Sequence, residues 1–408
     1  MRRLFFVCSL ASLLSALPAS AKDLAVKTPI SASNEVETSL VNSLLDVVKS
    51  RPDKALQGID AILVKNPNFR LAHLIKGDLL LARAQPISTL GNTSAAKFAS
   101  VDDLRQEARV RVDRYLNSPP LDLAPRHILQ MSADQPYALV VDTTRSRLYV
   151  YRNHNGEPRY LTDYYISSGK NGAQKLREGD QKTPTGVYQV VANLAKSTLT
   201  DFYGPGAFPL SYPNEWDKRE GRNGSGIWLH GTPSDTYSRA PRASNGCVVL
   251  SNGDLIDLAK YVNIGGTPVI ISTRAEWVNP AAWQAQRQQL LSALEQWRRD
   301  WESRDIERYL SHYDPRFAAD GKDLNLWSAQ KRTVNSGKTF INVTLSNVSI
   351  FSYPGAEDMA VVTFDQSYNS NNLGNDMKKR QYWLRDKNRW RIVYEGSAET
   401  IRTMTAKR

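Results

Sequence analysis

The spacing of hydrophobic residues changes along the chain and divides it into segments. Between residues 35 and 118, apolar residues recur three or four positions apart, which predicts amphipathic helices. The expected helices start near residue 35 and after Pro52, and run over 70–84 and 101–116. We therefore assign 35–118 to a helical domain for docking or dimerisation, and a plain structural cap fits the pattern equally well.

Residues 119–135 contain several prolines and are expected to form a linker. Beyond them the hydrophobic period shortens to the alternation that is typical of β-strands, first in 137–142 and 147–151, which suggest a hairpin. Short strands separated by Gly and Pro turns continue to a closing strand at 268–272. This pattern predicts a mostly-β sandwich over residues 136–273.

The last segment, residues 279–400, combines a long helix with later strands. Trp283, Leu290, Leu294 and Trp297 fall on one helical face, and four β-rich stretches follow after residue 340. A helix followed by strands predicts an α+β domain with a cupped sheet. The expected fold class is thus multidomain: an N-terminal all-α region, a central mostly-β sandwich and a C-terminal α+β domain.

The first residues have the features of a secretory signal peptide. Arg2 and Arg3 precede an apolar run of 14 residues, and a small-residue cleavage signal ends at Ala21. We expect 1–21 to be a signal peptide, 22–34 a disordered leader, and the mature protein to be exported. No later stretch approaches 18 apolar residues, so we expect no transmembrane segment.

Charge and cysteine content refine this picture. The formal net charge is +12, or +10 without Arg2 and Arg3, but no arginine-rich run or aromatic-interleaved basic stripe accompanies it, so we expect no nucleic-acid partner. Of the two cysteines, Cys8 lies in the signal peptide and leaves Cys247 as the remaining thiol. A single thiol in an exported protein cannot form an internal disulfide, which points to reactivity or intermolecular pairing.

The strongest chemical signal is a histidine that lies seventeen residues before this cysteine. His230 and Cys247 are each followed or preceded by a glycine, Gly231 and Gly246. One strand can deliver the imidazole and a returning loop the thiol, and an adjacent base activates a cysteine nucleophile. Gly246 leaves backbone N–H groups free to approach an oxyanion. The alternative is a buried structural cysteine near an incidental histidine.

Three motifs resemble those of the L,D-transpeptidase (YkuD) catalytic domain, over residues 136–273. They are Ser168-Gly169-Lys170, the Lys-Thr-Pro-Thr-Gly-Val-Tyr of 182–188, and His230-Gly231 followed by Ser244-Asn245-Gly246-Cys247. Residues 279–400 resemble the cone-shaped nuclear-transport-factor-like fold, through Trp297 to Trp301 and Tyr309 to Tyr313. The order of segments resembles the Cds6-type enzymes that shape Gram-negative cells.

The resemblance implies a periplasmic enzyme that acts on peptidoglycan stem peptides. Cys247 would attack the meso-diaminopimelate carbonyl of a tetrapeptide and release D-alanine, with His230 as base and then acid. The thioester would pass to an acceptor amine, as in a transpeptidase, or to water, as in an L,D-carboxypeptidase. Gly246, Ser244, Asn245 and Gly231 would shape the oxyanion site and its loop. No cofactor is implied, and no Cys, His and carboxylate cluster has metal-ligand spacing.

Two departures from the common family pattern concern substrate recognition. Asn245 stands where many members have histidine, and Val249 stands where many have arginine. Arg239 and Arg242 are the candidate cations for binding a substrate carboxylate instead, and a solvated surface position fits them equally well. Trp228 and Tyr212 are candidate substrate contacts, and packing within the framework is the alternative for both. A homodimer or a cell-wall protein partner would use the helical and C-terminal domains, and a non-catalytic cell-wall scaffold is the alternative from another class.

Overall fold

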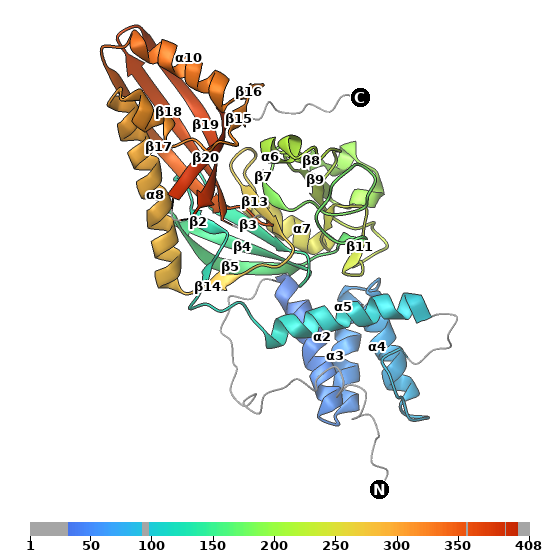
Figure 1. Cartoon of the computed structure of the whole chain (residues 1–408). Helices are drawn as coiled ribbons and strands as arrows, with labels where there is room; N and C mark the ends of the chain where they lie inside the picture. The colour runs from blue at the N-terminus through green and yellow to red at the C-terminus, as the bar shows by residue number, and fades with distance from the viewer. Residues whose placement is uncertain (1–31, 92–97, 356–357, 388, 399–408) are drawn as a thin grey trace.

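The computed structural model describes residues 32–91, 98–355, 358–387 and 389–398, which form a central β-sheet domain and one further region on each side of it (Figure 1). The N-terminal helices lie on one side of this domain, and the C-terminal α+β domain lies on the other. The predicted multidomain fold class is therefore confirmed. Among the described residues, we find no helix whose length and apolar character would let it span a bilayer.

The N-terminal region consists of helices, as its hydrophobic period predicts. They are α2 (Ala32–Val48), α3 (Pro52–Lys65), α4 (Arg70–Leu81) and α5 (Phe98–Leu116). Their buried faces share one apolar core, which includes Leu40, Ile59 and Ile75. The predicted signal peptide and residues 22–31 of the predicted leader lie outside the described residues. Residues 32–34, expected in the leader, belong to α2.

The central domain contains two sheets that enclose an apolar core. The first has the strand order β5-β4-β3-β13-β7, and the second has the order β12-β10-β9-β8. The strands of the first are β3 (Tyr137–Asp142), β4 (Arg147–His154), β5 (Glu157–Tyr165), β7 (Gly186–Gln189) and β13 (Pro268–Ser272). Those of the second are β8 (Leu194–Ala195), β9 (Gly206–Pro209), β10 (Trp228–His230) and β12 (Val248–Val249). The predicted hairpin corresponds to β3 and β4, which pair antiparallel.

Two short strands and two helices complete this domain. Strand β6 (Ser168–Gly169) pairs parallel with β11 (Arg242–Ser244), which brings two of the sequence motifs side by side. Helix α6 (Glu215–Arg219) follows β9 in the chain, and helix α7 (Asn252–Leu258) follows β12. Leu229 and Val248 point into the core between the sheets, where they pack with residues of the first sheet.

The segment expected to be a linker forms part of the fold. Strand β1 (Ala124–Pro125) pairs with β14 (Trp277–Val278), and β2 (Ile128–Gln130) adds an edge strand to the C-terminal sheet by pairing with β17 (Ile341–Ser352). Residues 119–135 thus cross from the helical region to the C-terminal domain. Because these strands are very short and their partners lie far along the chain, local composition did not indicate them.

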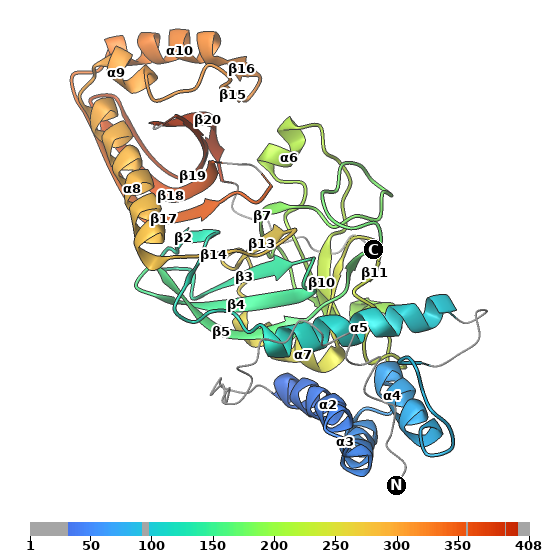
Figure 2. The ribbon, with the colours of Figure 1, turned by 60° about the horizontal axis from the view of Figure 1, so that its bottom comes forward.

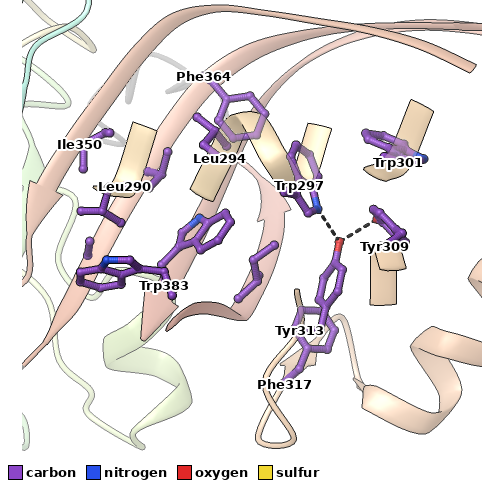
Figure 3. Close-up of a cluster of buried hydrophobic side chains, with 14 of the residues drawn as sticks. Leu290, Leu294, Trp297, Trp301, Tyr309, Tyr313, Phe317, Ile350, Phe364 and Trp383 are labelled. Atoms are coloured by element: carbon purple, nitrogen blue, oxygen red, sulfur yellow. Dashed lines mark hydrogen bonds between the residues drawn. The ribbon is translucent and has the colours of Figure 1, made fainter. Parts of the chain in front are cut away.

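The C-terminal domain is a curved sheet covered by a long helix (Figure 2). The sheet order is β2-β17-β18-β19-β20, with β18 (Met359–Ser370), β19 (Leu373–Asp386) and β20 (Arg389–Ser397). Helix α8 (Pro280–Glu302) packs on it, followed by α9 (Ile306–Leu310), β15 (Ala318–Ala319), β16 (Lys322–Asp323) and α10 (Leu324–Ser336). Figure 3 shows the core between α8 and the sheet, where the fully buried Trp297 packs against Trp301 and Phe364.

Candidate active site

His230 and Cys247 lie on adjacent parallel strands. His230 is the last residue of β10, and Cys247 directly precedes β12, with Leu229 paired to Val248 and His230 paired to Val249. Side chains alternate along a strand, and Leu229 and Val248 point into the core. His230 and Cys247 therefore both lie on the other face of the sheet, away from this core. The structure thus brings the predicted pair together.

The imidazole of His230 is buried and oriented by one hydrogen bond. Its Nδ1 lies 2.7 Å from the carbonyl oxygen of Gly231, which can only accept, so Nδ1 carries the proton and Nε2 is the free base. The rings of Phe202 and Tyr203 cover it, with centroids at 5.8 and 5.1 Å. Burial lowers the pKa of His230 to about 4, so the ring is neutral at pH 7.

The thiol of Cys247 is half-buried, and its Sγ lies 3.3 Å from the carbonyl oxygen of Gly226. Burial raises its pKa, whereas the backbone N–H of Trp228 and the charges of Arg239 and Lys175 act in the opposite direction. The resting pair is therefore a neutral thiol beside a neutral imidazole.

The loop before the cysteine is fixed by Ser244. Its Oγ donates to the carbonyl oxygen of Cys247 at 2.6 Å and accepts from the N–H of Gly246 at 3.1 Å. The N–H of Gly246, which was expected to be free for an oxyanion, thus donates to Ser244 in this structure. The N–H of Cys247 has no acceptor among the described residues, so it is a candidate donor to an oxyanion.

The two glycines of the site are required for different reasons. Gly246 has a φ of +126°, and a Cβ there would lie 2.8 Å from the carbonyl oxygen of Lys182. The hydroxyl of Thr183 donates to the carbonyl oxygen of Gly246 at 3.0 Å, which ties the 182–188 motif to the cysteine loop. A Cβ on Gly231 would meet Pro205 at 2.7 Å, so that glycine allows a close approach beside the histidine.

Arg239 is the predicted cation that the structure places at the site. Its guanidinium lies 4.5 Å from the ring centroid of Phe202, and its positive charge acts on both His230 and Cys247. Arg242 is exposed on β11, next to the loop. Asn245 is also exposed, and Val249, at the position where many family members have arginine, is buried beside His230.

The two predicted aromatic contacts differ in position. Trp228 is half-buried on β10, where its ring packs 5.0 Å from that of Tyr203. Tyr212 is buried in the domain core, its ring packs edge-on against Tyr188, and its hydroxyl donates to the carbonyl oxygen of Asn223. Tyr212 therefore packs in the framework and does not line the site, because its apolar ring faces the core.

Sequence reasoning missed two residues near the pair. Lys175 is buried, pairs with Asp180 at 2.7 Å, and its charge reaches Cys247. Phe202 covers the imidazole and the guanidinium of Arg239 from a different loop. Neither belongs to a motif in this sequence, and only the folded arrangement of loops brings them to the site. Among the described residues, no group of three or more His, Cys, Asp or Glu side chains could hold a metal ion.

Two protein-family models match the chain. The L,D-transpeptidase catalytic domain model (YkuD) matches residues 136–271, and the Cds6 C-terminal NTF2-like domain model matches residues 289–396. The first range contains His230 and Cys247, and the second contains α10, β17, β18, β19 and most of β20. The helices of residues 32–116 lie outside both matches.

Two solved structures resemble the chain over most of their own length. Bd1075 from Bdellovibrio bacteriovorus is 32% identical with a TM-score of 0.60, and the match covers 68% of this chain and 98% of Bd1075. The helical cell shape determining protein Pgp2 from Campylobacter jejuni is 26% identical with a TM-score of 0.57, over 69% of this chain and 96% of Pgp2. No curated protein matches the chain.

Proposed function

Because the chain belongs to the L,D-transpeptidase (YkuD) family, with the Cds6-type C-terminal domain, we propose that it is a cysteine acyltransferase of peptidoglycan stem peptides. The observation that carries the proposal is the placement of His230 and Cys247 on one face of two adjacent parallel strands. A base with a free Nε2 beside a neutral thiol is suited to proton transfer during nucleophilic attack.

The first half-reaction forms a thioester and releases D-alanine. His230 Nε2 takes the proton of the Cys247 thiol while Sγ attacks the meso-diaminopimelate carbonyl carbon of a tetrapeptide. The C–N bond to D-alanine then breaks, and His230 returns the proton to the leaving amine. The N–H of Cys247 stabilises the oxyanion, an interaction commonly worth about 3 kcal/mol.

The second half-reaction transfers the acyl group. An acceptor amine gives a proton to His230, attacks the thioester carbon and forms an amide, and the thiol of Cys247 recovers the proton. Water is the alternative acceptor, because Cys247 is half-exposed and solvent can reach its thioester. The guanidinium of Arg239 is suited to bind a substrate carboxylate near the sulfur.

We also propose where and in what process the enzyme acts. Residues 1–21 would direct export to the periplasm, where the stem peptides are found. Pgp2 is named as a determinant of helical cell shape. A role in cell shape for this chain follows by analogy with that relative. The helical and C-terminal domains would contact the cell wall, a second copy of the chain or another cell-wall protein.

Incubation with purified disaccharide tetrapeptide, followed by mass spectrometry of the products, tests the reaction. A diaminopimelate–diaminopimelate dimer supports transfer to an amine, and a tripeptide supports hydrolysis. Unchanged substrate without any covalent adduct, together with retained binding to isolated cell walls, would contradict both and favour a non-catalytic scaffold.

A further inference from the structure

The segment 233–241 connects the histidine strand to the strand that precedes the cysteine loop. It is separated from β10 by two residues, ends where β11 starts and carries Arg239. The guanidinium of Arg239 lies 4.5 Å from the ring centroid of Phe202, whose ring packs on His230, and its charge acts on His230 and Cys247. The position of segment 233–241 therefore determines where the charge of Arg239 lies. The helical region, which neither family match includes, packs against this segment.

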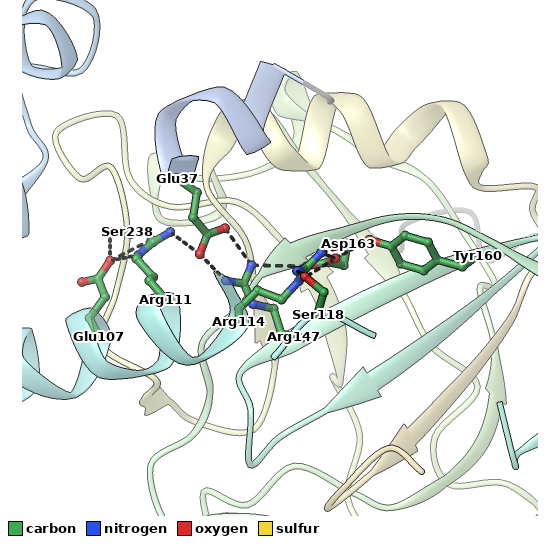
Figure 4. Close-up of polar contacts among 9 residues, drawn as sticks. All are labelled: Glu37, Glu107, Arg111, Arg114, Ser118, Arg147, Tyr160, Asp163 and Ser238. Carbon is green, nitrogen blue, oxygen red and sulfur yellow. Dashed lines mark hydrogen bonds and ion pairs between the residues drawn. The ribbon is translucent and has the colours of Figure 1, made fainter. Parts of the chain in front are cut away.

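Three direct contacts join the helical region to segment 233–241. The amide of Asn68 donates to the carbonyl oxygen of Ser234 at 3.4 Å, and the ring of Phe69 packs 4.2 Å from that of Tyr237. On α5, the carboxylate of Glu107 accepts a hydrogen bond of 2.7 Å from the hydroxyl of Ser238, the residue before Arg239 (Figure 4). Phe69 and Glu107 are fully buried or nearly so.

A fourth contact reaches Arg239 itself through an aromatic residue. The guanidinium of Arg111 lies 3.9 Å from the ring centroid of Tyr165, whose hydroxyl donates to the carbonyl oxygen of Arg239 at 2.7 Å. Arg111 also pairs with Glu107 at 2.8 Å on the same helix. The carboxylate that binds Ser238 and the guanidinium that stacks on Tyr165 are thus held as one unit.

The helices are in turn fixed to the catalytic sheet by buried ion pairs. Arg114 of α5 pairs with Asp163 of β5 at 2.5 Å, and Glu37 of α2 pairs with Arg147 of β4 (Figure 4). Arg147 also lies 3.4 Å from Asp163, which closes the network. Breaking a buried pair leaves an uncompensated charge and is costly, so this attachment is rigid.

We propose that the helical region is a positioning element of the active site: it holds segment 233–241 so that Arg239 stays beside Cys247 and His230. The proposal rests on the proposed function only in taking Cys247 as the reactive thiol. A passive cap would need the ion pairs to the sheet alone. The additional contacts with Ser234, Tyr237 and Ser238 act on the catalytic segment itself.

The test measures alkylation of Cys247 by iodoacetamide as a function of pH, in the full chain. The mass of the Cys247-containing peptide reports the reaction at this thiol alone. The variants are Ser238→Ala, which removes the bond to Glu107, and Phe69→Leu, which loosens the packing on Tyr237. Ser118→Ala is the matched control, because its hydroxyl accepts from Arg114 in the same network without touching segment 233–241.

We expect Ser238→Ala and Phe69→Leu to slow alkylation near pH 7 by about three- to tenfold, the effect of moving one partly screened charge. Arg239→Gln should slow it similarly, and adding Ser238→Ala to Arg239→Gln should change nothing more. The control should react like the parent protein. Circular dichroism and thermal melting verify folding, and Ser238→Ala remains informative if Phe69→Leu does not fold.

Two results would overturn the proposal. One is an unchanged pH profile of alkylation in both Ser238→Ala and Phe69→Leu while Arg239→Gln shifts that profile. The helical region would then be only a structural cap. The other is an equal slowing in the parent and Arg239→Gln backgrounds, which would exclude an effect through Arg239. Because alkylation needs no substrate turnover, either result is distinguishable from failure of the proposed acyl transfer.

Discussion

At the residue scale, the chemistry depends on two neutral groups. Burial lowers the pKa of His230 and raises that of Cys247, and both shifts disfavour a resting thiolate–imidazolium pair. In the proposed mechanism the thiol therefore loses its proton during attack, when the substrate carbonyl is in place. A neutral thiol is also less readily oxidised than a thiolate, so burial protects Cys247 from oxidation.

The pH dependence of kcat/KM follows from these pKa shifts. His230 is a base only while neutral, and its pKa of about 4 means that it stays neutral down to about that pH. We expect kcat/KM to vary less than about twofold between about pH 5 and 7, and to fall as the pH decreases through about 4. A decrease centred near pH 6.5, the ordinary range of histidine, would contradict this environment.

Removal of the base tests the role of His230 directly. His230→Ala should lower kcat/KM by about 10²- to 10⁴-fold, the usual contribution of general acid–base catalysis. The matched control is His154→Ala, because that histidine is exposed at the end of β4. Steady-state kinetics on a stem tetrapeptide measures both, and equal activities in the two variants would exclude His230 as the base.

At the scale of elements, sequence patterns predicted what is encoded locally. The helices of 35–118, the β3–β4 hairpin and α8 follow from their hydrophobic periods. Helix α10 was missed because few of its residues are apolar and only Trp327 and Ser328 are buried. Strand β2 was missed because it is stabilised by β17, more than 200 residues later. Likewise, the partner of the Gly246 N–H is evident only once the 244–247 loop is folded.

The cysteine loop provides an element-scale prediction. Gly246→Ala forces a side chain into a left-handed conformation and against the Lys182 carbonyl, so it should cost about 1–3 kcal/mol of stability. It should also displace Cys247 and lower kcat by more than about tenfold. Gly253→Ala is the control, because no atom lies within 4 Å of its Cβ position. Chemical unfolding and kinetics check both, and wild-type behaviour of Gly246→Ala would show that the loop adapts.

At the scale of the whole molecule, buried polar contacts join the three regions. Arg114 and Asp163 fix the helices to the central sheet, and Arg380 of β19 pairs with Glu215 of α6 at 3.0 Å on the other side. Hydrophobic periodicity predicts a helical range, 35–118, and a β-rich range, 136–273. It does not predict how the two ranges attach, because an ion pair between Arg114 and Asp163 has no signature in either local sequence.

The buried ion-pair network predicts that replacing two different carboxylates changes the free energy of unfolding by very different amounts. Asp163→Asn leaves Arg114 without its buried carboxylate partner and leaves Arg147 with Glu37 alone, so it should lower the free energy of unfolding by about 3–5 kcal/mol. Glu307→Gln removes an exposed pair with Arg332 and should cost at most about 1 kcal/mol. Denaturant unfolding of both variants measures this, and equal losses would contradict a structural role for the buried network.

The same network predicts how the stability of the fold depends on pH. Although burial opposes ionisation, Arg114 and Arg147 hold the pKa of Asp163 below its ordinary value. The folded state therefore releases this proton more readily than the unfolded chain. Its stabilising contribution is present above the ordinary carboxyl pKa and is lost as the pH falls below it.

The most direct measurement of the central claim is the intact mass of the protein after rapid quenching with disaccharide tetrapeptide. The account predicts an adduct equal to the disaccharide tripeptide acyl group, located on the Cys247 peptide, with one D-alanine released per adduct. Cys247→Ala should form no adduct and release no D-alanine while remaining folded. Release of D-alanine by Cys247→Ala at the wild-type rate would contradict catalysis by this thiol.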